Sequence, residues 1–95
     1  MAVIVSFACR KTEGLWRRQS DHGIPPQIER VALRKLTQLD RSRELPDLRL
    51  PPGNRLEALK GDRKGQQSIR VNDQWRICFR WHEGNAYEAE IVDYH

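Results

Sequence analysis

The sequence has few residues that bind metals or form cross-links. It contains only two cysteines, Cys9 and Cys78, no Cys-x-x-Cys pair, and three histidines that lie far apart along the chain. Because a metal site needs several such ligands at short spacing, we expect neither a metal nor another cofactor. We expect both thiols to be reduced.

Long apolar runs are also missing. No uninterrupted apolar stretch is long enough to span a bilayer. Residues 1–7 lack a basic leader and are too short for a signal peptide. These absences predict a cytoplasmic protein that does not act at a membrane.

What is present fits one small domain. The chain has 95 residues, of which 38% are hydrophobic and 32% are charged. This content supplies one modest core, so we predict a single domain over residues 1–95. Three Trp, two Phe and two Tyr, spread through patterned segments, are not typical of a disordered chain.

Charge is distributed unevenly along the chain. Residues 1–48 hold nine basic and six acidic side chains, residues 49–82 hold eight and three, and residues 83–95 hold four acidic and no basic ones. The excess of basic charge in the middle favours a surface that meets a polyanion. A solvated basic surface explains the same composition equally well.

The first half of the chain predicts one strand and two helices. Residues 3–7 are rich in β-branched and aromatic side chains, and a short helix is expected over about residues 9–20. Gly23 suits the left-handed position after a helix, and Pro25-Pro26 suits the start of the next one. Apolar residues then form one helical stripe: Ile28, Val31, Ala32, Leu36 and Leu39.

Residues 44–54 are rich in proline and predict a loop. We expect Leu45, Leu48 and Leu50 to pin this loop to the core.

The second half predicts four strands. They are expected at residues 55–59, 67–71, 75–81 and 86–95, with turns at 61–65, 72–74 and 83–85. Alternation within the third of these strands turns two sets of side chains to opposite faces. The apolar set is Trp75, Ile77, Phe79 and Trp81, and the other set is Arg76, Cys78 and Arg80.

These elements predict an α+β fold in the order β-α-α-β-β-β-β. The two helices cover the apolar face of a mostly antiparallel sheet. The opposite face stays open and carries the arginines, where it could hold a phosphodiester.

Several strings resemble one protein family when they are read together. They are PGNRL at 52–56, LKGDRKG at 59–65, SIRVNDQWRICF at 68–79 and IVDYH at 91–95. With Ser6-Phe7 near the start, they closely resemble the HigB-type toxins of the RelE/ParE toxin–antitoxin superfamily, in the plasmid-maintenance killer or GraT-like branch. The resemblance spans residues 1–95 in order and length.

The resemblance implies a fold, an activity and partners. HigB-type toxins have the RelE-like microbial-ribonuclease fold, enter the A site of the 70S ribosome and cut mRNA without a metal. A HigA-like helix-turn-helix antitoxin neutralises them, and the toxin–antitoxin complex binds operator DNA. We therefore expect a type II toxin with ribosome-dependent endoribonuclease activity.

The resemblance implies catalytic roles for Lys60, Arg76, Asp93, Tyr94 and His95, and it puts Glu57 at a further catalytic position. Lys60 and Arg76 match the residues that supply cations to the phosphate. Histidine is the residue type that can titrate near neutral pH, so His95 suits general acid–base work. Glu57 stands where the best-studied pattern has a histidine, and a carboxylate is a poor proton donor at neutral pH. Further contacts with RNA or the ribosome are expected from Arg55, Arg63, Lys64, Arg70 and Arg80.

Each of these residues also has a structural interpretation. Lys60 could be a solvated turn lysine, and Arg76 and Arg80 could belong to an exposed sheet face. His95 could be a frayed terminus. Two other functions stay open: a ParE-like gyrase inhibitor on the same fold, and a non-catalytic RNA-binding domain.

Overall fold

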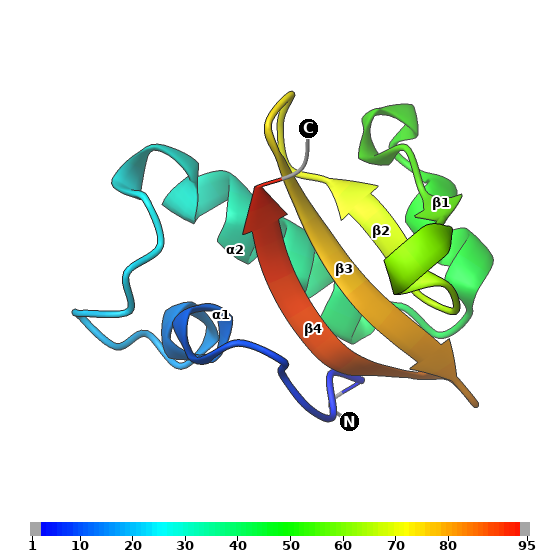
Figure 1. The fold of residues 1–95 in the computed structure, drawn as a ribbon, viewed down its shortest axis with the longest axis horizontal. Helices are drawn as coiled ribbons and strands as arrows, with labels where there is room; N and C mark the ends of the chain where they lie inside the picture. Colours follow the sequence, from blue (N-terminus) through cyan, green and yellow to red (C-terminus); the bar gives the residue numbers. More distant parts are fainter. Residues whose placement is uncertain (1–2, 94–95) are drawn as a thin grey trace.

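The computed structural model describes residues 3–93 and contains two helices and four strands (Figure 1). The helices are α1 (Arg10–Trp16) and α2 (Pro26–Arg41). The strands are β1 (Glu57–Ala58), β2 (Gln67–Arg70), β3 (Trp75–His82) and β4 (Asn85–Asp93). They form one antiparallel sheet in the order β1-β2-β3-β4. The predicted α+β fold class is confirmed.

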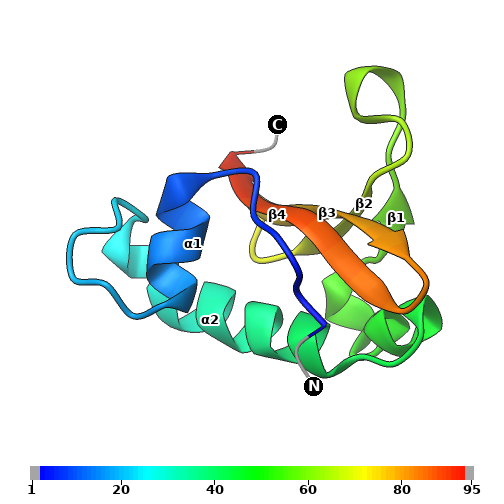
Figure 2. The ribbon, with the colours of Figure 1, turned by 90° about the horizontal axis from the view of Figure 1, so that it is seen from below.

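The core lies between the sheet and α2, which runs along one face of it (Figure 2). Its fully buried residues include Ala32 and Leu36 of α2 and Ile69, Ile77 and Phe79 of the sheet, all 0% exposed. The three tryptophans pack around this core and are partly buried. The predicted apolar stripe and apolar sheet face are therefore correct.

The predicted first strand is reduced to two isolated parallel bridges with β4. The bridges pair Ile4 with Ala86 and Phe7 with Ala89. The ladder is interrupted between the two bridges, where Glu88 takes a left-handed φ and its N–H bonds to the Ser6 side chain and not to the backbone of the segment. At the start of the segment, the Asp40 carboxylate accepts hydrogen bonds from the backbone N–H groups of Val3 and Ile4 at 2.9 and 3.1 Å. The segment is still held along the outer edge of β4.

A bulge in β4 explains how that edge is covered. The pairing of β3 with β4 shifts by one residue midway along the strands. Glu88 adopts a left-handed φ of 54°, and its N–H donates to the Ser6 hydroxyl at 2.9 Å. Farther along, the N–H of Ile91 donates to Thr12 Oγ1 of α1, also at 2.9 Å. The first residues of the chain thus cover an otherwise open strand edge.

α1 is shorter than the helix predicted over residues 9–20. It ends at Trp16, because Arg18 adopts a left-handed φ of 61° and its N–H bonds to the Leu15 carbonyl at 3.1 Å. Gly23 has a positive φ of 86°, but it lies in the connection to α2 and not at the end of α1. α2 begins at Pro26 as predicted.

The loop over residues 44–54 contains two short 3₁₀ helices, η1 (Leu45–Arg49) and η2 (Pro52–Asn54). Leu48 is 0% exposed, as expected of a residue that pins the loop, but Leu50 is 67% exposed, so that part of the prediction is wrong. The reason is that the Leu50 carbonyl, and not its side chain, points inward: it accepts a hydrogen bond from Asn54 Nδ2 at 3.2 Å.

Asn54 fixes this loop to α2. Its side chain is 0% exposed and donates to Gln38 Oε1 at 3.0 Å and to the Leu48 carbonyl at 3.2 Å. Its Oδ1 accepts a hydrogen bond from the buried Lys35 ammonium. Burial, and then the nearby Arg34 and Arg70, lower the pKa of Lys35.

β2, β3 and β4 are close to the ranges predicted for them, but β1 is not. β1 covers only two of residues 55–59, because Arg55 takes a left-handed φ of 46° and breaks the extended backbone. The turn predicted at 83–85 is confirmed, with positive φ at Glu83 and Gly84 (49° and 80°), as a tight hairpin requires. The turn at 61–65 contains a third 3₁₀ helix, η3 (Gly61–Arg63). Within residues 3–93, no helix has the length and apolarity needed to cross a membrane.

Candidate active site

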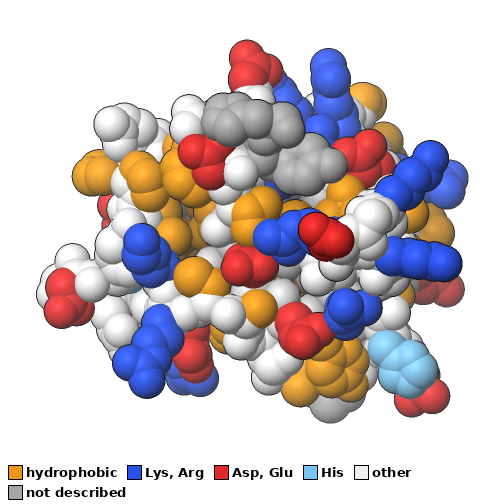
Figure 3. All heavy atoms as spheres, in the orientation of Figure 1, with side chains coloured by type: hydrophobic (Ala, Val, Ile, Leu, Met, Phe, Trp, Pro, Cys, Tyr) orange, Lys and Arg blue, Asp and Glu red, His pale blue; other side chains and the backbone are white. Residues whose placement is uncertain are grey.

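Cross-strand pairing aligns four residues on the side of the sheet that α2 leaves uncovered. Glu57 pairs with Ser68, Ser68 with Cys78, and Cys78 with Glu90. Directly paired residues point to the same side of a sheet, so this row crosses all four strands. We call this surface, with the neighbouring Arg76, the open face; Figure 3 looks onto it.

Arg76 is anchored in the open face by two groups from other strands. Its Nη1 lies 3.3 Å from Glu57 Oε1 and donates to Ser68 Oγ at 3.2 Å. The Arg76 side chain is 16% exposed and that of Glu57 is 49% exposed. The sheet therefore presents a guanidinium of fixed position beside an accessible carboxylate.

A second guanidinium covers the middle of the row. Arg63, in η3, donates to Glu90 Oε1 at 3.2 Å and to Gln66 Oε1 at 3.1 Å. Cys78 is 0% exposed, and this burial raises the pKa of its thiol. Cys78 is thus a buried strand residue and not a reactive nucleophile.

Lys60 lies where the chain leaves β1 and enters η3. Figure 2 shows this connection standing out from the sheet on the side away from α2. The Lys60 side chain is exposed and has no hydrogen-bond or ion-pair partner among residues 3–93. Its charge is therefore available to a ligand at the rim of the open face.

The other predicted RNA contacts differ in how their charge is balanced. Arg80 Nε lies 2.6 Å from Glu88 Oε2, and Arg70 pairs with the exposed Asp73. Arg55 and Lys64 are exposed at the two ends of the β1–η3 segment. In Figure 3, acidic and basic side chains are accordingly intermixed over the sheet, and basic ones gather over the side that holds β1 and β2.

Asp93 lies on the other side of the sheet from Arg76. It pairs with Trp75, whose side chain packs on the core, whereas Arg76 pairs with Val92. The Asp93 carboxylate accepts a hydrogen bond from Gln74 Nε2 at 3.0 Å. Residues 94 and 95, which include the predicted Tyr94 and His95, lie outside the described residues. The structure thus brings together Glu57, Arg76 and the Lys60 connection, and it separates Asp93 from them by strand register.

Two residues of this site were not predicted from the sequence. Ser68 supplies the buried hydroxyl under Arg76, and Glu90 supplies the carboxylate for Arg63. The alternation of residues 67–71 put Ser68 on the same face as Arg70. Ser68 contacts Arg76 because of the register between β2 and β3, and local sequence does not encode that register.

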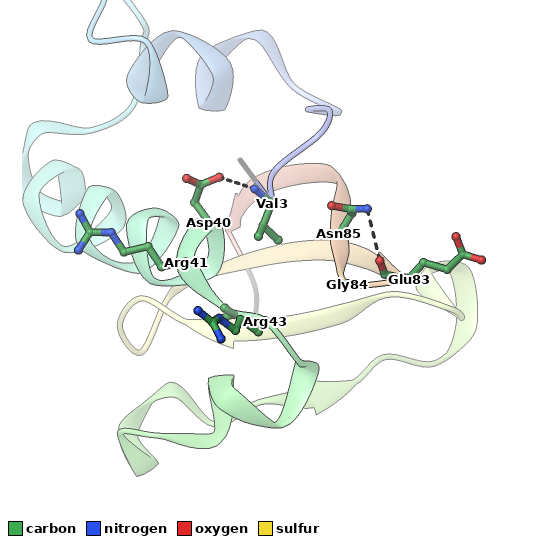
Figure 4. Close-up of a pocket in the computed structure, with 8 residues that line it drawn as sticks. Val3, Asp40, Arg41, Arg43, Glu83, Gly84 and Asn85 are labelled. Atoms are coloured by element: carbon green, nitrogen blue, oxygen red, sulfur yellow. Dashed lines mark hydrogen bonds between the residues drawn. The ribbon is translucent and has the colours of Figure 1, made fainter. Parts of the chain in front are cut away.

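One groove in the described part of the chain lies away from the open face. Its volume is about 1000 Å³, and Figure 4 shows it between the end of α2, the first residues and the β3–β4 turn. Its lining includes Asp40, Arg43 and Glu83. Among residues 3–93, no three His, Cys, Asp or Glu side chains are grouped so that they could hold a metal ion.

An α+β fold in which two helices pack with a four-stranded antiparallel sheet is the fold of RelE-like toxins. Residues 6–95 match the family described as the RelE-like toxin of the type II toxin–antitoxin system HigB, and the chain belongs to this family. The resemblance seen in the sequence is therefore confirmed. As a type II toxin, the protein has an antitoxin partner.

The chain is similar to three known proteins, and two of them carry the HigB name. The chain is 52% identical over 68 residues to Toxin HigB-1 of Vibrio cholerae, covering 72% of each chain. It is 35% identical over 94 residues to Endoribonuclease HigB of Proteus vulgaris, covering 98% of this chain and 100% of that one. It is 38% identical over 72 residues to an uncharacterized protein of Haemophilus influenzae, covering 76% and 70%.

Proposed function

We propose that this toxin is an endoribonuclease that cuts mRNA in the A site of the 70S ribosome. The observation that carries the proposal is the guanidinium of Arg76, held between Glu57 at 3.3 Å and Ser68 at 3.2 Å beside the exposed Lys60 connection. The full-length match to a relative named an endoribonuclease supports it.

The reaction begins when the ribose 2′-oxygen attacks the adjacent phosphorus. The P–O bond to the 5′-oxygen breaks, which leaves a cyclic phosphate and a free 5′-hydroxyl. The five-coordinate intermediate carries extra negative charge, and cations stabilise it. Arg76 is suited to bind two phosphate oxygens at once, and Lys60 acts as a point charge.

Two protons must also move. Glu57 is the carboxylate nearest the phosphate-binding guanidinium and can accept the proton of the 2′-hydroxyl once the RNA phosphate has taken its place on Arg76. The 5′-oxygen needs a proton donor. We assign this role to His95, with Tyr94 as the second candidate, because an imidazolium is the stronger acid. Asp93 is proposed to orient the end of the chain.

Substrate orientation comes from the ribosome in this proposal. The chain is too small to enclose an mRNA, and Arg63, Arg70 and Arg80 already pair with carboxylates of the chain. A ribosome that bends the mRNA would align the 2′-oxygen with the leaving oxygen. The exposed basic residues of the β1–η3 segment, Arg55 and Lys64, would then contact RNA.

The proposal extends to partners and location. We propose that the antitoxin is a HigA-like helix-turn-helix protein and that the complex binds operator DNA through it. Because ribosomes are the site of action, we expect the toxin to work in the cytoplasm. Residues 1–95 are proposed to act as one domain.

The test is single-turnover cleavage of mRNA on translating 70S ribosomes, run beside an assay for trapped gyrase–DNA complexes. We expect cuts in the A-site codon and no trapped gyrase. Arg76→Ala should abolish the cuts, and Arg49→Ala, an exposed arginine outside the open face, serves as the matched control. Trapped gyrase with intact mRNA would instead assign a ParE-like inhibitor, and RNA binding without cuts would assign a binding domain.

A further inference from the structure

Lys60 begins the connection between β1 and β2, and its position has to be fixed by something other than its own side chain. That side chain has no hydrogen-bond or ion-pair partner within residues 3–93. A cation that stabilises a reaction intermediate must be held to within about 0.5 Å of its productive position. The connection stands out from the sheet (Figure 2), so the constraint must come from contacts that its other residues make.

Backbone hydrogen bonds close this connection into one turn. The N–H of Leu59 donates to the Gln66 carbonyl, and the N–H of Gln66 donates to the Arg63 carbonyl, both at 2.9 Å. The N–H of Arg63 donates to the Lys60 carbonyl at 3.3 Å, which forms the turn of η3. A displacement of Arg63 is therefore passed directly to the backbone of Lys60.

The Arg63 side chain fastens this turn to the far side of the sheet. Its Nη1 donates to Glu90 Oε1 at 3.2 Å, across 27 residues of sequence, and to Gln66 Oε1 within the turn at 3.1 Å. The Arg63 and Glu90 side chains are 33% and 29% exposed. Glu90 belongs to β4, at the opposite end of the strand order from β1. We call this contact the Arg63–Glu90 bridge; it holds the connection over the open face.

A second arginine lies against the other end of the turn. Gly65 has a left-handed φ of 93°, and a Cβ atom at this residue would lie 2.8 Å from Arg80 Nη1. Arg80 is in turn held by Glu88, whose Oε2 lies 2.6 Å from its Nε. The backbone of the turn thus approaches a guanidinium of β3 as closely as glycine permits.

The bridge is a neighbour of the phosphate-binding Arg76. Burial raises the pKa of the Cys78 thiol, and the charges of Arg63, Glu90 and Arg76 also act on it. Glu90 therefore puts a negative charge close to the site where RNA phosphate is expected, and this charge opposes phosphate binding. Its contact with Arg63 gives Glu90 a role there that outweighs this cost.

We propose that the Arg63–Glu90 bridge positions the Lys60 ammonium over the open face for the RNA phosphate. Arg63 and Glu90 are then positioning residues: they act through Lys60 and do not need to touch the RNA. This inference rests on the proposed function, since it concerns the geometry of that reaction. It differs from the sequence prediction that Arg63 contacts RNA directly.

Removal of Glu90 separates these two roles of Arg63. A guanidinium that binds RNA directly would be freed by Glu90→Ala, so cleavage would be as fast as before or faster. A guanidinium that positions Lys60 would lose its anchor, so cleavage would slow. The matched control is Glu13→Ala on α1, which removes the carboxylate that lies 3.0 Å from Arg17 Nε and changes the net charge equally.

The experiment is single-turnover cleavage of mRNA on translating 70S ribosomes at saturating toxin, with the fold of each variant checked by circular dichroism. Arg63→Gln and Glu90→Ala should each lower the maximal rate by about 10- to 100-fold, since a displacement of about 1 Å can cost as much as 10²-fold. Arg63→Lys keeps the ion pair with Glu90 and should recover most of the rate. Glu13→Ala should cleave at the parent rate.

The same assay in a Lys60→Ala background shows whether the bridge acts through Lys60. Lys60→Ala alone should lower the maximal rate by about 10²- to 10³-fold, as loss of one group that stabilises the charged intermediate does. Adding Arg63→Gln or Glu90→Ala should then cost nothing further, because there is no ammonium left to misplace. A bridge that only stabilised the fold would give losses that multiply.

Two results would overturn the proposal. The first is Glu90→Ala cleaving as fast as Glu13→Ala, and the second is losses that multiply in the Lys60→Ala background. Failure of the ribonuclease proposal is a different result, in which the parent does not cut ribosome-bound mRNA. Hydrogen exchange of the free toxin then still tests the bridge: Glu90→Ala should speed exchange of the Arg63 and Gln66 amides, and exchange equal to that of Glu13→Ala would refute it.

Discussion

Replacing Glu57 with glutamine should tighten the binding of RNA phosphate at Arg76. In the free toxin the Glu57 carboxylate lies 3.3 Å from Arg76 Nη1 and competes with phosphate for it. Coulomb attraction at this distance in a water-like dielectric is about 1.3 kcal/mol. We use this low value because the Glu57 side chain is 49% exposed and therefore screened. It corresponds to about an eightfold gain in affinity.

The same substitution should slow cleavage, because glutamine cannot accept a proton from the 2′-hydroxyl. Loss of a general base reduces rates by about 10²- to 10⁴-fold. Single-turnover cleavage on programmed ribosomes, measured over a range of toxin concentrations, separates the two effects. The toxin concentration that gives half of the maximal rate should fall, and the maximal rate should fall as well. Glu83→Gln, at the exposed β3–β4 turn, is the matched control.

If Glu57→Gln needs a higher toxin concentration to reach half of its maximal rate, the competition argument is refuted, because the carboxylate then helps to hold the substrate. An unchanged maximal rate would refute the role of Glu57 as the base. The two conclusions are independent, because one rests on affinity and the other on rate.

Four further predictions follow from the site and the core. Arg76→Ala should relieve the growth arrest caused by expression without antitoxin, at equal abundance and with the fold retained by circular dichroism. A chain ending at Tyr94 should cleave ribosome-bound mRNA about 10²- to 10⁴-fold more slowly than the parent in single turnover; a rate within a few-fold would move the acid role to Tyr94 or the ribosome. Asn54→Ala should lower the free energy of unfolding in urea by about 3 kcal/mol, because several buried hydrogen bonds are lost. Cys78 should resist iodoacetamide in the native protein while Cys9 reacts, and mass spectrometry of the labelled chain would show any exception.

Local signals were enough to predict much of the fold. Pro26 at the start of α2 and the Glu83-Gly84 turn are determined by residues next to each other in sequence, so both were found correctly. The end of α1 was missed because an arginine, Arg18, takes the left-handed position that usually indicates glycine.

The site was predictable only in part, because strand register determines its geometry. Composition and alternation put Arg76 on a polar face, but they do not reveal that Ser68 and Glu57 meet it from two other strands. The position of Asp93 opposite Trp75 is likewise a matter of register. A shift of one residue along β4 would move Asp93 to the other face.

The hydrogen bonds that fasten the start of the chain to β4 have a consequence for biosynthesis. The Ser6–Glu88 and Thr12–Ile91 contacts join residues 82 and 79 positions apart. Contacts of such long sequence separation form late and slow folding. The ribosome must therefore synthesise nearly all of residues 6–91 before Ser6 and Thr12 can form these hydrogen bonds with β4. A nascent toxin thus spends most of its translation without a finished sheet.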